Sequence, residues 1–502
     1  MMTKYLKINP ADNVAVAIKD LAAGEKAGGV TLREAILAGH KFALSDLKKD
    51  ENVIKYGYAI GHTIQDVPAG GWVNEKNIKT NLSGMLEYSY EPVPAPKPDA
   101  KDAARTFRGF RRADGSTGIR NEVWIIPTVG CVNGAAGRLA EMLRAETGIP
   151  SAGQSPPEGV TGIAAFPHNY GCSQLGGDHE NTRKILRDMV LHPNAGGVLV
   201  IGLGCENNQI SAFKEMLGPV DAQRIKFMET QKVQGDEIEE GMRLLREIYA
   251  VASADRREEV PIAELRVGLK CGGSDGFSGI TANPLLGVLS DRLTACGGTS
   301  VLTEVPEMFG AETILMSRAK DRLTFDKTVS LINDFKGYFL CNEHPIYENP
   351  SPGNKAGGIS TLEEKSLGCT QKSGGAEVQG VLMYGERLRE KGLNLLSAPG
   401  NDLVAATALA AAGCQVVLFT TGRGTPFGSF VPTMKISTNS ALAAGKPHWI
   451  DFNAGVILEG QSMDRTADAF TEYLLKVASG EAVNNEKSGF REIAIFKTGV
   501  TL

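Results

Sequence analysis

Residues 197–206 read GVLVIGLGCE, and this stretch sets the class of fold that the chain is expected to adopt. Its first part, residues 198–201, is an apolar run bounded by glycine, which is typical of a strand buried on both faces. A glycine-rich loop follows at once, and the amphipathic pattern over residues 209–217 predicts a helix. A buried strand, a loop and a helix in this order predict a parallel sheet covered by helices.

The same order recurs along most of the chain after residue 105. Strands are expected at residues 123–126, 162–166, 198–201, 265–269, 299–303, 394–397 and 416–420. Helices are expected at residues 135–146, 180–191, 209–217, 284–295, 324–340, 402–412 and 464–478. This alternation predicts a multidomain α/β protein whose strands end at shared sheet edges, where ligands normally bind.

Proline and charge indicate where the chain divides. Residues 91–105 read EPVPAPKPDAKDAAR, with proline at every second position from 92 to 98. Such a run joins neither a helix nor a central strand, so an extended linker is expected, with an ordered loop inside one domain as the alternative. The charged run ASADRREE at residues 252–259 indicates a second boundary. We therefore expect a module at 1–90, a linker at 91–105, a middle α/β domain at 106–258 and a C-terminal domain at 259–502.

The sequence pattern of the first module differs from that of the rest of the chain. Short apolar runs at residues 14–18, 53–56 and 71–73 are separated by Gly, Pro and Asp, which predicts a small β module. One or two helical turns are expected over residues 31–38, with Thr31 as the cap.

Charge and the N-terminal residues exclude several classes of protein. The 53 lysines and arginines nearly balance 58 aspartates and glutamates, which gives a formal net charge of −5. This balance argues against a nucleic acid or an anionic membrane bound through bulk positive charge. The start MMTKYLK lacks the apolar segment of a signal peptide, and no stretch approaches the roughly 20 apolar residues of a membrane span. A cytoplasmic protein with reduced thiols is expected.

Glycine, with 59 residues, is the outlier of the composition, and five of the eight cysteines directly follow one. Cys131, Cys172 and Cys205 each lie just past a predicted strand, where thiolates can hold iron or another borderline metal. No C-x-x-C motif is present, so a structural zinc site is disfavoured. The three could hold an iron–sulfur cluster with one open iron, some could bind a single iron ion, or all could be small buried apolar residues.

Several charged or polar residues share these settings. Glu206 directly follows Cys205, and Asp275 and Glu304 also lie past predicted strands, where a carboxylate can bind a metal or satisfy loop amides instead. His168 precedes Cys172 by four positions and is a candidate acid or base.

Two glycine-rich loops present single cations. Lys355 and Arg423 would suit a substrate carboxylate, although isolated loop cations are more often simply solvated.

The sequence does not match the known nucleotide-binding motifs. Gly202-Leu203-Gly204 follows a strand, but Asn207 stands where the third glycine of G-x-G-x-x-G should be. The sequence also lacks a P-loop and a G-x-S-x-G elbow, so a dinucleotide or ATP enzyme is disfavoured.

Longer blocks of sequence point to one family. The blocks are GHK with AL at residues 39–44, YGC at 170–172, IGLGCE at 201–206, CGGSDGFSG at 271–279, TANP at 281–284, PSPGNK at 350–355 and TTGRGTP at 420–426. Together they resemble the altronate dehydratase and galactarate dehydratase family of sugar-acid hydro-lyases. The altronate branch is the most similar, through CVNG at 131–134, Asp178-His179, Cys369 and the final GVTL at 499–502.

The resemblance implies an architecture and a cofactor. It implies an N-terminal β-clip module of the SAF type, a middle domain that forms a homodimer, and a Rossmann-like C-terminal domain with a parallel sheet. It also implies iron or another divalent metal, and the cysteines leave open whether the iron is Fe²⁺ or part of an iron–sulfur cluster. One block departs from the family: the V-H-x-H-N stretch of altronate dehydratases reads VNEKN at residues 73–77, which leaves the sugar acid open.

The implied reaction removes water from a sugar acid, with D-altronate to 2-keto-3-deoxy-D-gluconate in hexuronate catabolism as the first expectation. Galactarate or another acid sugar is the alternative substrate, and a non-catalytic carbohydrate-binding protein is the alternative from another class. A metal or fixed cations must stabilise the enolate-like transition state, while a base and an acid move protons. The hypothesis assigns catalysis to His40, His168 and Lys355, substrate binding to Asn133, Ser274 and Arg423, and metal binding to Cys131, Cys172, Cys205, Glu206, Asp275 and Glu304. His40 can take part only if the first module folds over the sheet edge.

Overall fold

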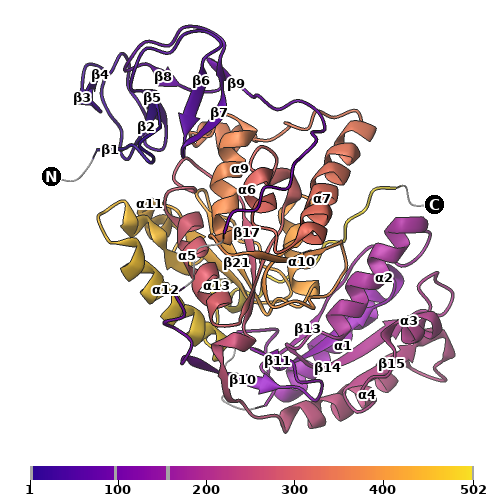
Figure 1. Ribbon diagram of the computed structural model, residues 1–502. Helices are drawn as coiled ribbons and strands as arrows, with labels where there is room; N and C mark the ends of the chain where they lie inside the picture. Colours follow the sequence, from indigo (N-terminus) through magenta and orange to yellow (C-terminus); the bar gives the residue numbers. More distant parts are fainter. Residues whose placement is uncertain (1–3, 95–98, 154–158, 500–502) are drawn as a thin grey trace.

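The computed structural model describes residues 4–94, 99–153 and 159–499. The first module, indigo in Figure 1, lies at one end of the molecule, and the region after residue 262 occupies the centre. The magenta region between them in sequence lies at the opposite end. Residues 95–98 of the expected linker and residues 500–502 of the final block lie outside the described residues.

The first module consists of short antiparallel strands. One sheet has the order β1-β2-β5-β8, formed by Tyr5–Leu6, Val14–Ala17, Lys41–Ala43 and Trp72–Val73. A second has the order β6-β7-β9, from Asn52–Lys55, Tyr58–Thr63 and Ile78–Lys79, and β3 and β4 (Lys26–Ala27, Val30–Thr31) pair beside them. The helical turn expected over residues 31–38 is wrong. Ile36 instead pairs with Leu21 and both are buried, so the backbone bonds across to another segment rather than along a helix.

The first module is fastened to the C-terminal region by buried charge. Lys41 and Lys55 lie 2.8 and 2.7 Å from the carboxylate oxygens of Glu364, and all three side chains are about 1% exposed. The backbones also approach closely, because a Cβ added at Gly276 would lie 1.9 Å from the Gly39 carbonyl oxygen. The first module therefore folds over the central region, as a role for His40 requires.

The middle region is a parallel sheet with the order β13-β12-β14-β15, covered on both faces. Its strands are Glu122–Pro127 (β12), Gly162–Ala165 (β13), Ala195–Gly202 (β14) and Ile225–Glu229 (β15). Asn133–Thr147 (α1) and Glu237–Ser253 (α4) pack on one face, and Gly176–Val190 (α2) and Ile210–Leu217 (α3) pack on the other. Alternate side chains of one strand serve the two faces: Val123 and Ile125 contact the first pair, and Trp124 and Ile126 the second. The predicted parallel strands and their helices are confirmed here.

The central region is a seven-stranded parallel sheet with the order β19-β20-β18-β17-β21-β22-β23. The strands are Arg266–Cys271 (β17), Thr299–Leu302 (β18), Val378–Leu382 (β19), Gly392–Leu396 (β20), Val416–Thr421 (β21), Thr433–Ser437 (β22) and Phe452–Asn453 (β23). The longer helices are Ala282–Ala295 (α5), Arg322–Cys341 (α7), Asp402–Ala411 (α10) and Met463–Ala478 (α12). Short helices are Glu312–Met316 (α6), Pro352–Ala356 (α8), Leu362–Thr370 (α9), Ser440–Gly445 (α11) and Asn484–Lys487 (α13). The α/β class and a small β module at the N-terminus are therefore as expected. The elements that were not predicted are β15 and α4 in the middle region and β19, β22, β23, α6, α8, α9, α11 and α13 in the central region.

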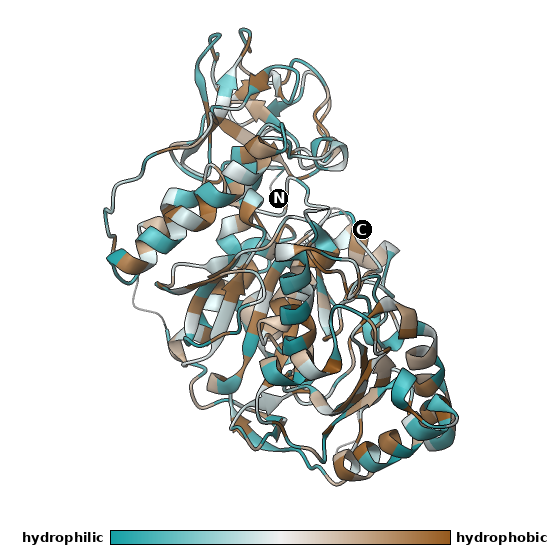
Figure 2. Ribbon diagram, turned by 90° about the vertical axis from the view of Figure 1, so that its right-hand side faces the viewer, coloured by the Kyte–Doolittle hydropathy of each residue, from teal (hydrophilic) through white to brown (hydrophobic). Residues whose placement is uncertain are grey.

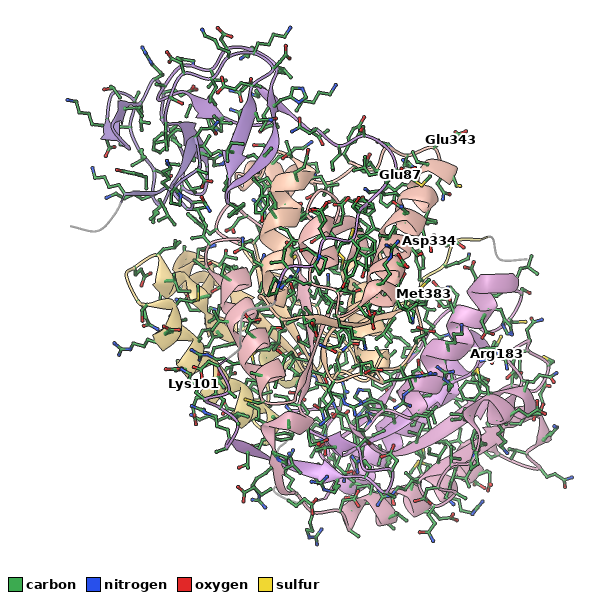
Figure 3. The ribbon with its side chains drawn as sticks, in the orientation of Figure 1. Glu87, Lys101, Arg183, Asp334, Glu343 and Met383 are labelled. Carbon is green, nitrogen blue, oxygen red and sulfur yellow. The ribbon has the colours of Figure 1, made fainter. Side chains whose placement is uncertain are left out.

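A small antiparallel sheet joins the regions. Thr106–Arg111 (β10) lies between Thr117–Gly118 (β11) and Glu258–Pro261 (β16), so the chain enters and leaves the middle region side by side. Figure 2 shows hydrophobic residues concentrated on the strands inside the molecule, and Figure 3 shows side chains filling the layers, with Lys101 and Glu343 at the periphery. Within the described residues, no helix is long and apolar enough to cross a membrane.

Candidate active site at the carboxyl edge of the seven-stranded sheet

The edge where β17 and β18 end gathers the buried charged residues of the central region. Cys271 is the last residue of β17, and Glu304 follows β18 by two positions. Glu304 has a φ of 68°, in the left-handed region, which costs a residue with a side chain about 1–3 kcal/mol. This turn places the Glu304 carboxylate 2.6 Å from Lys270 Nζ and 3.3 Å from Lys372 Nζ.

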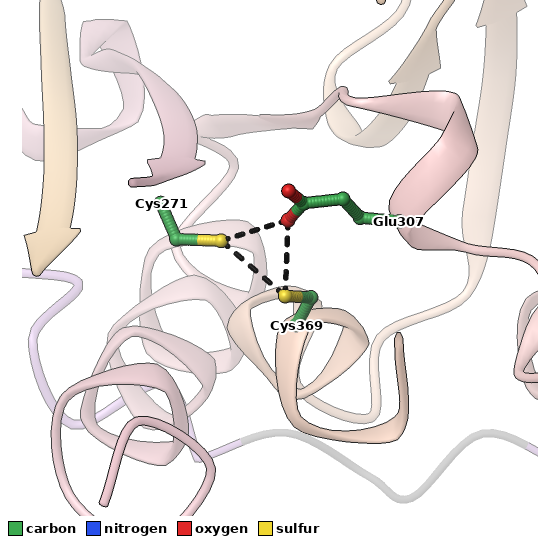
Figure 4. A group of neighbouring side chains, drawn as sticks. All are labelled: Cys271, Glu307 and Cys369. Carbon is green, nitrogen blue, oxygen red and sulfur yellow. Dashed lines mark hydrogen bonds between the residues drawn. The ribbon is translucent and has the colours of Figure 1, made fainter. Parts of the chain in front are cut away.

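Two thiols and one carboxylate converge at this edge (Figure 4). The Sγ atoms of Cys271 and Cys369 lie 3.3 Å apart, and Glu307 Oε2 lies 3.1 Å from each of them. Cys369 comes from α9, the same helix that binds the first module through Glu364. We call Cys271, Glu307 and Cys369 the thiol–carboxylate group.

The thiol–carboxylate group has the donor atoms and the charge balance for a divalent metal. Soft thiolates with a carboxylate suit iron or zinc, and their atoms all lie within 4.8 Å of one another. Three lysines, Lys270, Lys365 and Lys372, balance three carboxylates, Glu304, Glu307 and Asp402, in ion pairs of 2.6–3.3 Å. Each of the two thiols can lose its proton as a divalent cation binds, and the two charges of the cation then offset those of the two thiolates.

Electrostatics favour ionised Glu307 and protonated Cys369 in this setting. Burial alone would raise the pKa of Glu307, but the ammonium groups of Lys365 and Lys372 outweigh it and hold that pKa at about 2. The hydrogen bond with Cys271, together with burial, raises the pKa of Cys369 well above its ordinary value. Lys372 Nζ lies 2.8 Å from Cys271 Sγ, so a cation faces that sulfur directly.

An open cavity of about 350 Å³ adjoins this group. Its walls are the strand end at 271–273, the loops at 349–354 and 400–403, and the side chains of Glu307 and Lys365. This volume is within the usual range for small-molecule sites, and a cation, a carboxylate and a thiol line it. The cavity can therefore hold a small polar molecule against the thiol–carboxylate group.

Four of the predicted residues lie on or against helix α8, which borders the cavity through Asn354. This helix carries Lys355, and His40 Nε2 from the first module lies 3.3 Å from the Ala356 carbonyl at its end. Arg423 Nη1 donates to the Gly353 carbonyl at 3.5 Å, the one side-chain hydrogen bond of Arg423 among the described residues. The Ser274 carbonyl accepts from Asn354 Nδ2 at 2.8 Å.

The local environments of His40 and Ser274 are suited to contacts with a ligand. Burial lowers the pKa of His40, and its ring packs edge-to-face on Trp72 with centroids 5.2 Å apart. Its imidazole is therefore neutral. The Ser274 hydroxyl is buried and has no hydrogen-bond partner among the described residues.

Asp275 is buried among donors from its own loop and from the loop after β22. Its carboxylate accepts from Phe277 N at 3.1 Å, Ser278 Oγ at 3.1 Å and Thr438 Oγ1 at 2.9 Å. This is the loop-amide alternative that the sequence left open. Glu304, by contrast, does border the thiol–carboxylate group.

The remaining predicted residues lie on the other parallel sheet, not beside Cys271. Asn133 Nδ2 donates to the His168 carbonyl at 2.8 Å, and Glu206 accepts from Thr128 Oγ1, Leu203 N and Gly204 N at 2.6–3.1 Å. Both ring nitrogens of His168 are also occupied, by the Pro127 carbonyl at 2.8 Å and Tyr170 N at 3.1 Å. These contacts hold loops together. The hypothesis placed all the predicted residues in one site, and the structure corrects this, because it divides them between two sheets.

Sequence reasoning missed most of the charged residues of the site. Glu307 lies in no recognisable motif, and Lys365 and Lys372 look like ordinary helix-surface cations. The one available signal was the Gly-Cys pair at Cys369, in a stretch that also carries Glu364. Only the fold reveals that every residue of α9 is buried.

Comparison with known proteins covers the whole chain. Family models match residues 3–81 (Altronate/galactarate dehydratase SAF domain), 109–253 (D-galactarate dehydratase/Altronate hydrolase, second domain) and 262–501 (D-galactarate/Altronate dehydratase, C-terminal). The chain is 56% identical over 506 residues to an altronate dehydratase of Bacillus subtilis (strain 168), covering all of both proteins. It is 56% identical to an altronate dehydratase of Escherichia coli (strain K12), over 99% of this chain and all of the relative. It is 33% identical to the L-threo-forming galactarate dehydratase of Escherichia coli (strain K12), over 95% of this chain and 93% of the relative.

Proposed function

Since the chain belongs to the altronate and galactarate dehydratase family, we propose that it removes water from D-altronate to give 2-keto-3-deoxy-D-gluconate in hexuronate catabolism. Family membership makes the chain a sugar-acid dehydratase, a hydro-lyase, so the proposal concerns the choice of acid. The observation that carries it is 56% identity over the full length to altronate dehydratases, against 33% to a galactarate dehydratase. The alternative of a non-catalytic carbohydrate-binding protein is set aside.

Lys365 is the cation that the proposed reaction would use. The proton beside the carboxylate leaves, the neighbouring hydroxyl departs, and the enol becomes a 2-keto-3-deoxy acid. A carboxylate already carries charge, so the second negative charge of the enolate needs a fixed cation nearby. The Lys365 ammonium is 7% exposed, lines the cavity and is held 2.8 Å from Glu307. We assign it to the stabilisation of that charge.

We propose Fe²⁺ as the metal of the thiol–carboxylate group. When bound, the metal supplies a Lewis acid for the carboxylate or the departing hydroxyl. Cys271, Glu307 and Cys369 would hold it, in place of the six ligands that the sequence suggested. The two thiols and one carboxylate support a choice of iron over Mg²⁺ or Ca²⁺, which prefer all-oxygen ligands.

Residues around α8 supply the remaining contacts in this proposal. Arg423 and Lys355 bind the substrate carboxylate, because within the described residues Arg423 uses only Nη1 in a hydrogen bond and keeps other guanidinium donors for a bidentate contact. Ser274 contacts a substrate hydroxyl with its Oγ, which has no hydrogen-bond partner in the described part of the chain. His40, neutral through its lowered pKa, can accept a proton at ordinary pH.

Anaerobic incubation of the full chain with ferrous iron tests the substrate. D-altronate and galactarate are supplied in parallel, and the 2-keto-3-deoxy acid is measured. We expect the higher kcat/KM with D-altronate, and a Lys365→Met variant should lose turnover with both acids. A higher kcat/KM with galactarate would overturn the choice of acid without touching the assignment as a hydro-lyase.

The oligomeric state, the domain boundaries and the cellular location of the chain are also proposals. We infer a homodimer formed through the middle domain at residues 106–258, separated by the linker at 91–105 from the first module and followed by the C-terminal domain. Light scattering on the purified chain tests the dimer. A reducing cytoplasmic setting is supported by eight cysteines that are all free thiols.

A further inference from the structure

We propose that Cys131, Cys172 and Cys205 bind an iron–sulfur cluster at the carboxyl edge of the four-stranded sheet. We call these three residues the cysteine edge. This site is separate from the thiol–carboxylate group, which lies on the seven-stranded sheet. The inference does not depend on the substrate or on the metal proposed above.

The three cysteines follow three neighbouring strands. β13, β12 and β14 are adjacent and parallel, and Cys172, Cys131 and Cys205 lie in the loops that follow them. Adjacent strands are about 4.8 Å apart, so the three loop starts span only about 10 Å. All three cysteines are free and exposed, whereas Cys271 and Cys369 are buried.

Hydrogen bonds lock these loops to one another. Gly130 N donates to the Tyr170 carbonyl at 2.9 Å, which fixes the residue before Cys131 against the loop of Cys172. Asn208 N donates to the Gly171 carbonyl at 3.0 Å, and Ser173 N donates to Asn207 Oδ1 at 2.8 Å. The backbone on both sides of Cys172 is thus bonded to the loop of Cys205.

Buried polar side chains build the base of this edge. The Glu206 carboxylate is 1% exposed and holds the loop of Cys205 through two backbone amides and Thr128. His168 and Asn133 hold the loops of Cys172 and Cys131. At Gly171, φ is 101° and an added Cβ would lie 2.0 Å from the Thr128 carbonyl, so this close approach requires glycine. The thiols are therefore presented by rigid loops.

Spacing favours a cluster over a single ion. Two sulfurs on one metal ion, each bonded at about 2.3 Å, can be no more than about 4.6 Å apart. Among the described residues, the only three-residue set with all ligand atoms within 4.8 Å of one another is the thiol–carboxylate group. At least one pair of thiols on the cysteine edge is therefore too wide for a shared ion. In a [4Fe–4S] cluster each cysteine binds a different iron, which suits wider spacing and leaves the fourth iron open to solvent.

Ligation needs no reagent beyond iron and sulfide. Each thiol loses its proton as its sulfur bonds to iron, so three protons are released and a water molecule takes the fourth iron. Equal amounts of ferrous and ferric iron with matching sulfide assemble a [4Fe–4S] core of charge +2, without an electron donor or acceptor. Gln231 Nε2 lies 3.6 Å from Cys205 Sγ and Ser173 Oγ lies 4.0 Å from Cys172 Sγ, so two donors face these sulfurs.

The test measures iron and acid-labile sulfide on the full chain. The protein is purified without oxygen and reconstituted with ferrous iron, ferric iron and sulfide, and Mössbauer spectra are recorded. We expect about four irons and four labile sulfides per chain at this site. Cys131→Ser, Cys172→Ser and Cys205→Ser should each lose most of the sulfide and the visible absorption. Cys341→Ser, which changes another exposed thiol, is the matched control and should keep both.

Three results would overturn the proposal. One is iron without labile sulfide, which would indicate a single ion. The second is full sulfide content in all three serine variants. The third is loss of sulfide from Cys271→Ser and Cys369→Ser alone, which would place the cluster at the other sheet. Thermal unfolding of each variant checks that it is folded, and because the altered thiols are exposed, we expect melting temperatures close to that of the parent chain.

Discussion

Glu364→Gln should loosen the first module from the rest of the protein. The carboxylate of Glu364 is 1% exposed and is shared by the ammonium groups of Lys41 and Lys55 at 2.8 and 2.7 Å. Removing its charge leaves two cations buried without a counterion. Breaking a buried pair in this way typically costs about 3–5 kcal/mol.

The pKa of Glu364 gives a second route to the same magnitude. Burial alone would raise this pKa, but Lys41 and Lys55 outweigh it and lower it from 4.5 to about 2. The difference corresponds to about 3 kcal/mol in favour of the ionised form in the folded state. Because the folded pKa is the lower one, this stability is present above pH 4.5 and is lost as the pH falls from 4.5 towards 2.

Urea unfolding at neutral pH measures the effect, with limited proteolysis between residues 91 and 105 as a probe of release. Asp66→Asn is the matched control, because its pair with Lys48 is more than half exposed and should contribute at most about 1 kcal/mol. Replacing Glu364, Lys41 and Lys55 together by methionine should recover most of the loss, since no buried charge then remains unpaired. If Glu364→Gln unfolds within about 0.5 kcal/mol of the parent chain, the reasoning is refuted.

Four further substitutions test the two sheet edges. Cys369→Ser should lose the iron of the thiol–carboxylate group and lower kcat by about a hundredfold, measured by metal analysis and product assay; retention of both would contradict the ligand assignment. Lys365→Met should destabilise the fold by about 3–5 kcal/mol in denaturant unfolding, because the Glu307 carboxylate loses its 2.8 Å partner; an unchanged midpoint would refute this. Arg423→Lys should raise KM about tenfold with little change in kcat, since lysine cannot grip a carboxylate with two nitrogens; an unchanged KM would remove Arg423 from the substrate site. Glu206→Gln should lower the free energy of unfolding by about 1–3 kcal/mol, because glutamine keeps only one of the two oxygens that accept hydrogen bonds from Leu203 N and Gly204 N. A free energy of unfolding equal to that of the parent chain would argue against a role of Glu206 in holding this loop.

The parallel sheets were predictable because their signal is local. An apolar run such as residues 198–201 is buried on both faces, so its composition alone distinguishes it from loops and from half-exposed strands. The edge strand β23 and helix α9 carry no such signal. Phe452–Asn453 is only two residues long, and α9 is buried along its whole length although its residues include Glu363, Glu364 and Lys365.

The candidate site was predictable only in part. His40, Ser274, Lys355 and Arg423 do gather around α8, as blocks of glycine-rich sequence had suggested. The cysteines after the middle strands were correctly placed at a strand edge, but at a different edge from that of Cys271. Nothing local distinguishes one parallel sheet from another, so the division into two sites had to come from the fold.

The sequence by itself determined the family, the α/β class and the residues that follow each buried strand, because these depend on short-range patterns of apolar residues and glycine. Only the tertiary structure decided which charges meet. Lys41 and Glu364 are 323 residues apart, and Cys271 and Cys369 are 98 residues apart, yet each pair lies in direct contact. A buried charge is stable only beside its counterion, and that requirement acts across space rather than along the chain. The charges that hold the first module against α9 are therefore a property of the folded protein alone.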